Sequence, residues 1–159
     1  MDQIDREILG ILQKDSTVTV SDIGEFVGVS ATPSWRRIQR MEDRGIIRRR
    51  VAILDADKVG AGVTIFVSIC AATHSEDWRR RFVEAIEHIP EVTEVYRTSG
   101  NTDYVLKLAV PDLPAYDAFC RKLASRVELR SVSSMFAMDR IKQTTELPLG
   151  YVVPAQRGR

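Results

Sequence analysis

The chain has 159 residues, of which 44% are apolar and 28% are charged. This length accommodates one ordinary domain or two small ones, and the composition excludes a disordered or low-complexity protein. The formal net charge of +1 excludes a histone-like protein, whose whole surface would attract nucleic acid.

The few cysteines and histidines provide neither a disulfide framework nor the closely spaced ligands of a zinc site. Cys70 lies in an apolar stretch and Cys120 on the inner face of a predicted helix, so both are expected to be buried thiols. His74 and His88 have no obvious catalytic partner and are expected at the surface. We therefore expect no metal ion and no cofactor.

The N-terminus and the longest apolar stretch indicate where the protein is found. The chain opens with Met1 and early acidic residues, not with a basic and then apolar leader, so no signal peptide is expected. The stretch Val63–Ala72 is interrupted by Thr64 and Ser68 and is shorter than the roughly 20 residues that cross a bilayer. We expect a cytoplasmic protein without membrane contact.

The first third of the chain has the periodicity of short helices. In the first helix, apolar residues recur at intervals of three and four, at Ile4, Ile8, Ile11 and Leu12. A second helix is predicted over Ser21–Val27, with Ser21 as its N-cap. Gly28 then ends this helix, because glycine permits the left-handed turn of a helix C-terminus.

A third helix is predicted to begin at Ser30 or Thr32 and to end at Gly45. Pro33 lies in its first turn, where the missing N–H costs no hydrogen bond. The periodicity predicts a core-facing side formed by Trp35, Ile38 and Met41. Three helices with a tight turn before the third are the arrangement of a helix-turn-helix, whose third helix enters the major groove of DNA.

The residues after the third helix predict a short strand and then a linker. Ile46–Leu54 is β-like and predicts a short strand that leaves the helices. Asp55–Gly60 is polar, short and ends in glycine. We therefore expect a DNA-binding domain over residues 1–54 and a linker over residues 55–60.

The rest of the chain predicts a ferredoxin-like βαββαβ domain over residues 61–149, followed by a tail over residues 150–159. Helices are recognised by spacings of three and four, and strands by alternation. The predicted elements are a strand over Val63–Ala72, a helix over Ser75–Ile89, strands over Glu91–Thr98 and Tyr104–Val110, a helix over Leu113–Arg126 and a strand over Arg130–Ile141. The fold class is therefore α+β.

The near-neutral total conceals an uneven distribution of charge. Residues 1–30 carry two basic and six acidic side chains, a net charge of −4. Residues 31–50 carry seven basic and two acidic side chains, a net charge of +5, and the remaining 109 residues sum to zero. All seven basic residues of the middle segment are arginines, whose planar guanidinium suits phosphates and guanine edges.

This arginine-rich segment coincides with the predicted third helix and indicates duplex DNA as a partner. Hydroxyls at the leading end can contact bases, and arginines can bind phosphate or guanine. The alternative is a solvated, charged helix face, which the helix-turn-helix context disfavours. The candidate DNA-binding residues are Ala31, Thr32, Ser34, Arg36, Arg37, Arg40 and Arg49.

Several stretches of the chain resemble the Lrp/AsnC family, the leucine-responsive and asparagine-responsive transcriptional regulators also called feast/famine regulators. The resemblance runs from Met1 to about Leu149. It is carried by IDREIL at 4–9, LQKD at 12–15, VGVSATP at 27–33, RIQRME at 37–42, GII at 45–47 and SGNTDY at 99–104. It implies an N-terminal winged helix-turn-helix and a C-terminal ferredoxin-like domain that senses amino acids.

The resemblance also implies how such a regulator assembles and responds. Members of the family form homodimers through their C-terminal sheets and assemble further into tetramers or octamers, around which DNA can wrap. An amino acid binds between C-terminal domains and changes the assembly or the affinity for DNA. By this resemblance, the effector-binding candidates are Ser99, Gly100, Asn101, Thr102, Asp103 and Tyr104 in a glycine turn, with Ser133 and Ser134 on the last strand.

The glycine turn departs from the family pattern at one position. Family members usually carry an acid directly after the glycine, where this chain has Asn101. Asp103 remains to pair with an ammonium group, and backbone N–H groups near Gly100 can hold a carboxylate. A simple hairpin turn is the alternative interpretation. Met135–Pro148 resembles a proteobacterial subgroup with a cysteine-responsive member, so cysteine or another small amino acid is the expected effector.

Two other functions are compatible with this fold class. A small ferredoxin-like enzyme would need converging titratable groups, and the sequence shows no nucleophile elbow or P-loop, so no enzymatic activity is expected. An effector-binding or scaffold module would use its helical head to contact protein instead of DNA. Steep salt dependence of DNA binding distinguishes the regulator from this module.

Overall fold

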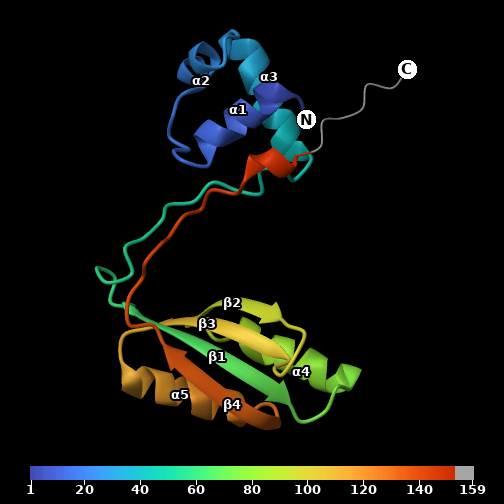
Figure 1. The fold of residues 1–159 in the computed structure, drawn as a ribbon, viewed down its shortest axis with the longest axis vertical. Helices are drawn as coiled ribbons and strands as arrows, with labels where there is room; N and C mark the ends of the chain where they lie inside the picture. The colour runs from blue at the N-terminus through green and yellow to red at the C-terminus, as the bar shows by residue number, and fades with distance from the viewer. Residues whose placement is uncertain (153–159) are drawn as a thin grey trace. The chain divides into compact units, whose positions relative to one another are not determined.

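The structure is a computed structural model that describes residues 1–152. Its contacts divide the chain into two units, which Figure 1 shows with the chain coloured from blue to red. The first unit comprises Met1–Ala52 together with the described residues from Lys142 onward, and the second comprises Ile53–Ile141. The contacts therefore assign residues 142–149 to the first unit, whereas the sequence suggested a second domain that extends to residue 149. Residues 153–159 of the predicted tail lie outside the described part of the chain.

The first unit contains the three expected helices, which are α1 (Gln3–Leu12), α2 (Val20–Phe26) and α3 (Ala31–Asp43). Asp2 and Asp5 cap α1 reciprocally, because each carboxylate accepts the backbone N–H of the other residue. Thr19, and not the predicted Ser21, is the N-cap of α2. The core of this unit is formed by Ile8, Leu9, Leu12, Ile23, Ile38 and Met41.

Two glycines permit the tight turn between α2 and α3. Gly28 has a φ of 72°, in the left-handed region that glycine adopts without strain. A Cβ atom at Gly24 would lie 2.6 Å from the carbonyl oxygen of Val29 and 3.2 Å from Oγ of Ser34. The absence of a side chain at Gly24 therefore lets the start of α3 lie against α2.

The strand predicted over Ile46–Leu54 does not form. The backbone N–H groups of Ile46 and Ile47 donate to the carbonyl oxygen of Met41, which closes the C-terminal turn of α3. A strand needs a neighbouring strand for its backbone groups, and residues 46–54 have none within the described part of the chain. The prediction was wrong because β propensity alone does not supply a partner.

The second unit has the predicted βαββαβ order. Its elements are β1 (Val63–Ala71), α4 (Glu76–Glu87), β2 (Val92–Arg97), β3 (Tyr104–Val110), α5 (Leu113–Ala124) and β4 (Leu129–Phe136). The strands form one antiparallel sheet in the order β2-β3-β1-β4. The strand predicted to extend to Ile141 ends at Phe136. The antiparallel register places Val63, the first residue of β1, opposite Met138, so the predicted residues 139–141 have no strand beside them within the described part of the chain.

The two faces of this sheet differ in burial. Ile65, Val67 and Ile69 of β1 point into a core that side chains of α4 and α5 complete. Phe66, between them in sequence, lies on the opposite face and is 37% exposed. Its partner across the ladder is Met135 of β4, which is also exposed. The helices therefore cover one face of the sheet and leave an apolar pair on the other.

The segment that follows the sheet packs against the first unit. Gln13 donates its side-chain amide to the carbonyl oxygen of Leu147 and accepts the backbone N–H of Leu147 through its own side-chain oxygen. Leu149, the first residue of the short 3₁₀ helix η1 (Leu149–Tyr151), packs against the core of the first unit. None of the helices in residues 1–152 combines the length and the apolar character needed to cross a membrane.

Candidate functional site

The third helix has a sharply divided surface. Ser34, Ile38 and Met41 are at most 1% exposed and face the core of the first unit. Thr32 and Arg36 are exposed on the other side of the helix. Because residues three and four apart lie on the same side of a helix, α3 presents one polar face outward.

The structure buries Ser34, which sequence analysis placed on the outer face. Its hydroxyl donates to the carbonyl oxygen of Ser30 at 3.1 Å, and the residue is fully buried. The small side chain fits where α3 lies closest to Gly24 of α2. The predicted location of Ser34 was therefore wrong, and its hydroxyl serves the contact between α2 and α3.

The structure exposes Trp35, which the periodicity placed in the core. Its side chain is 52% exposed. Successive residues of a helix point about 100° apart, so Ser34 and Trp35 cannot both lie at the centre of the buried face. The close approach of Gly24 selects the smaller side chain, and that part of the predicted core was wrong.

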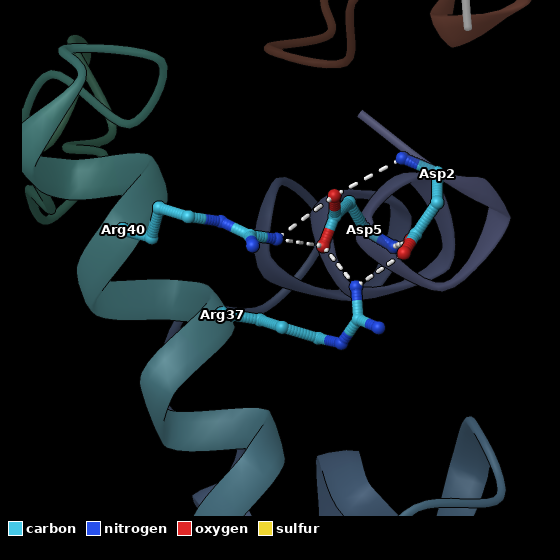
Figure 2. A network of polar contacts seen from close by, with 4 residues as sticks. All are labelled: Asp2, Asp5, Arg37 and Arg40. Carbon is cyan, nitrogen blue, oxygen red and sulfur yellow. Dashed lines mark hydrogen bonds and ion pairs between the residues drawn. The ribbon is translucent and has the colours of Figure 1, made fainter. Parts of the chain in front are cut away.

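Arg37 and Arg40 of α3 contact α1 through the two acids of its capping box (Figure 2). Nη1 of Arg37 lies 2.6 Å from Oδ2 of Asp2 and 2.7 Å from Oδ1 of Asp5. Nη2 of Arg40 lies 3.2 Å from Oδ1 and 3.3 Å from Oδ2 of Asp5. Asp5 is a buried carboxylate, so these arginines compensate a charge that α1 alone would leave unpaired.

This network changes the ionisation of its members. The backbone N–H of Asp5 and then the guanidinium of Arg37 lower the pKa of the Asp2 carboxyl. Hydrogen bonds to Asp2 and then to Asp5 raise the pKa of Arg37 further above its already high value. Arg37 is therefore a permanent cation bound to two carboxylates, and its charge is directed toward α1.

The other predicted DNA-binding residues lie at the surface. Ala31 and Thr32 are exposed in the first turn of α3, and Arg36 and Arg49 are exposed further along the chain. Within residues 1–152, neither Arg36 nor Arg49 has an acidic partner, whereas Arg50 pairs with Glu42 at 3.0 Å. The arginine-rich segment thus divides into cations that hold the unit together and cations that face solvent.

The glycine turn between β2 and β3 is fixed to the end of β1. Oδ2 of Asp103 accepts the backbone N–H of Ala71 at 2.8 Å, and the backbone N–H of Asp103 donates to Ile69. Gly100 has a φ of 115°, a conformation that favours glycine. Asp103 therefore has a structural role in the turn. Its other oxygen lies 3.8 Å from Nδ1 of His74.

Other members of the predicted effector group have different surroundings. Ser99 and Asn101 are exposed, and Thr102 accepts the hydroxyl of Thr98 through its carbonyl oxygen at 2.7 Å. Tyr104 lies on the helix-covered face, where its ring centroid is 4.5 Å from that of Phe82. The turn therefore exposes the small polar residues Ser99 and Asn101, and Tyr104 beside them packs against the aromatic ring of Phe82.

Ser133 and Ser134, the two effector-binding candidates on β4, point to opposite faces of the sheet. The hydroxyl of Ser134 lies 2.5 Å from that of Tyr116 on α5, beneath the helices. Ser133 pairs with Ser68 across the ladder, on the uncovered face. A single small ligand therefore cannot contact both serines on one face.

Residues beside the turn were missed by sequence analysis. Sγ of Cys70 donates to the carbonyl oxygen of Asn101 at 3.3 Å. Hydrogen bonding with Ser131 and then Arg130 lowers the pKa of the Cys70 thiol. The ladder that pairs Cys70 with Ser131 brings these groups beside the turn, and only strand register could have revealed it.

Two family models match the chain. Residues 1–48 match a winged helix-turn-helix DNA-binding model, and residues 64–147 match the Lrp/AsnC ligand binding domain. The chain belongs to the Lrp/AsnC family. It is therefore a DNA-binding transcriptional regulator with a ligand-binding domain.

Two relatives of this Lrp/AsnC regulator align over almost the whole chain. The glutamate uptake regulatory protein of Zymomonas mobilis is 45% identical, over 94% of this chain and 91% of the relative. The DNA-binding transcriptional activator DecR of Escherichia coli K12 is 42% identical, over 94% of this chain and 99% of the relative.

Two solved structures share the architecture of this Lrp/AsnC regulator. The AsnC family transcriptional regulator from Agrobacterium tumefaciens is 56% identical with a TM-score of 0.93, over 96% of this chain and 100% of the other. The transcriptional regulator NMB0573 from Neisseria meningitidis, solved with L-Met, is 31% identical with a TM-score of 0.91, over 96% and 99%. These matches confirm the predicted fold class.

Proposed function

We propose that this regulator contacts duplex DNA through the outer face of α3 and the arginines that follow it. Thr32 and Arg36 are exposed on the leading half of the helix, and the small Ala31 lets the helix start approach DNA closely. Arg40 remains 53% exposed beside Asp5 and can reach a phosphate, as can Arg49. The observation that carries the proposal is the division of α3 into a buried face and an arginine-bearing outer face.

Salt titration of DNA binding tests this proposal. A duplex is first selected from a randomised library with the full-length protein, and its binding is followed by fluorescence anisotropy. We expect affinity to fall steeply with added salt, because each neutralised phosphate releases counterions. If no duplex is retained at low salt, or if binding is insensitive to salt, DNA recognition by this face is wrong.

The effector proposal concerns the glycine turn. We infer that a free amino acid, cysteine or another small one, binds beside Ser99–Asp103 and changes assembly or DNA affinity. Support comes from the exposed Asn101 and Ser99, from Asp103 with an oxygen near His74, and from the L-Met complex of the Neisseria relative. Backbone groups near Gly100 suit the carboxylate of such a ligand.

Thermal shift against the twenty amino acids tests the effector proposal. A ligand that binds only the folded state raises the apparent melting temperature by mass action. We expect a small amino acid to give a saturable shift that the Asn101→Ala variant weakens. A shift that is unchanged in this variant would remove Asn101 from the site, and no shift with any amino acid would contradict the proposal.

Assembly follows from the uncovered face of the sheet. We propose that two copies pair through this face, where Phe66 and Met135 are exposed, and that dimers associate into tetramers or octamers. The assembly would act on DNA in the cytoplasm. Light scattering of the wild type and of Phe66→Lys measures it, since a charge in this apolar face opposes dimerisation. An unchanged mass in the variant would exclude this face.

A further inference from the structure

The exposed Trp35 differs sharply from the other tryptophan of the chain. Trp78 is 3% exposed, stacks on Phe82 with ring centroids 5.0 Å apart, and donates its indole N–H to the carbonyl oxygen of Glu128. Trp35 is 52% exposed, and within residues 1–152 its indole N–H has no acceptor and its ring has no aromatic neighbour. A large ring left in water is a surface available for contact with a partner.

The neighbours of Trp35 indicate what kind of partner this surface fits. Thr32 precedes it by three residues and Gln39 follows it by four, so both lie on its side of α3. Arg36 is adjacent and has no acidic partner within the described residues. An apolar ring among donors and an unpaired cation suits a polyanion that also carries apolar groups.

The major groove of duplex DNA provides both kinds of group. Its walls are phosphates, its base edges offer acceptors to arginine and glutamine, and the 5-methyl group of thymine is its main apolar contact. An aromatic ring beside Arg36 can cover such a methyl group and shield it from water. A protein partner would be expected to bind the exposed ring in an apolar pocket. The unpaired positive charge of Arg36 beside the ring favours a polyanion, and therefore favours DNA over a protein.

We propose that Trp35 is a specificity-determining residue that contacts the 5-methyl group of thymine in the major groove. The inference rests on the proposed DNA-binding face and names one chemical group that this face reads. Gln39 lies one turn further along the same side of the helix, where its side-chain amide donates to Oε2 of Glu42 at 2.7 Å and would exchange that contact for an adjacent adenine. The face is thereby expected to favour A·T pairs next to the contacts of Arg36.

Replacement of thymine by deoxyuridine isolates this contact, because it removes the methyl group and leaves the base pairing unchanged. In the duplex selected by the wild type, each thymine is replaced in turn. We expect at least one replacement to weaken wild-type binding by about fourfold, the value of one buried methyl group. We expect the Trp35→Ala variant to bind the selected duplex more weakly and to show no penalty at that position.

Control variants separate the contact from a general effect on folding or affinity. Phe26→Ala removes another aromatic ring of the first unit, 71% exposed at the end of α2, and is expected to keep the deoxyuridine penalty. Trp35→Phe retains an aromatic ring and is expected to keep part of it. Circular dichroism measures whether Trp35→Ala is folded. We expect it to be folded, because removal of an exposed ring leaves no cavity in the core.

The possible outcomes distinguish this inference from the proposed function. If the wild type binds DNA but no deoxyuridine replacement weakens it, Trp35 does not read thymine. If Trp35→Ala shows the same penalty as the wild type, the methyl group is read by another residue. Both results overturn the inference and leave DNA binding in place. Failure of the wild type to bind any duplex overturns the proposed function itself.

Discussion

Arg37 and Asp5 form an ion pair of 2.7 Å that joins the third helix to the first. The two residues are 32 positions apart, one in the most basic segment of the chain and the other in the most acidic. The carboxylate of Asp5 also caps α1 and contacts Arg40. Part of the apparent attraction of the arginine-rich segment for DNA is therefore neutralised within the unit.

The Asp5→Ala variant tests the importance of this pair for stability. It leaves the backbone N–H of Asp2 and the guanidinium of Arg40 without their acceptor, and it leaves Arg37 with Asp2 alone. We expect the first unit to lose about 1–3 kcal/mol of unfolding free energy. Chemical denaturation measures the change. Glu7→Ala is the control, because Glu7 is exposed on the same helix and, within residues 1–152, accepts a hydrogen bond only from Gln3. Equal stability of the two variants would contradict the assigned role of Asp5.

Arg36 and Arg37 are expected to respond oppositely to truncation. Arg36→Ala should weaken binding to the selected duplex by about 1–3 kcal/mol with little effect on stability. Arg37→Ala should destabilise the first unit by about 1 kcal/mol and, where still folded, bind the duplex almost normally. Anisotropy and denaturation on both variants measure these effects. The interpretation fails if Arg37→Ala loses sequence preference without loss of stability.

Acid sensitivity follows from the lowered pKa of Asp2. Because this pKa is lower in the folded chain than the ordinary value of 3.8, the carboxylate stabilises the fold above about pH 4. That contribution is lost as the pH falls through the folded pKa. We expect Asp2→Asn to flatten the fall in unfolding free energy as the pH drops below about 4. Asp43→Asn, at an exposed acid of α3, is the control and should keep the wild-type profile.

The C-terminal segment is expected to stabilise the first unit. Leu149→Ala removes a partly buried side chain and should cost about 1 kcal/mol. Hydrogen exchange of the amides around Gln13 should quicken, since Leu147 would be released from its two contacts with that residue. Leu147→Ala is the matched control, because the Leu147 side chain is 72% exposed. Unchanged exchange rates in Leu149→Ala would show that packing of the C-terminal segment does not protect the amides around Gln13.

Asp103 is expected to affect stability as well as ligand binding. Asp103→Ala leaves the backbone N–H of Ala71 without an acceptor, so the second unit should lose about 1–3 kcal/mol. Asp103→Asn retains an oxygen acceptor and should recover much of this loss. Denaturation followed through the fluorescence of Trp78 measures both variants. A ligand response lost in Asp103→Asn with stability retained would separate the two roles.

Local features of this protein were predictable from short stretches of sequence. β3 runs over Tyr104–Val110 as expected, because alternation and a preceding glycine turn define it. Ser75 caps α4 as predicted, since its hydroxyl accepts the backbone N–H of Trp78. Gly28 has the expected left-handed conformation. Each of these features depends on residues only a few positions apart.

Packing against the other helices selected which side chains of α3 are exposed. Helical periodicity allowed either Ser34 or Trp35 at the centre of the buried face, and the close approach of Gly24 on α2 selected the serine. Charge composition identified the arginine-rich segment, but Asp5 of α1 determined that Arg37 turns inward. Periodicity and turn residues predicted the helices and the order of the sheet strands, but they also predicted a strand over Ile46–Leu54 that does not form. Contacts with α1 and α2 selected the exposed face of α3. Side-chain volumes and opposite charges on different helices can be matched only once those helices pack together.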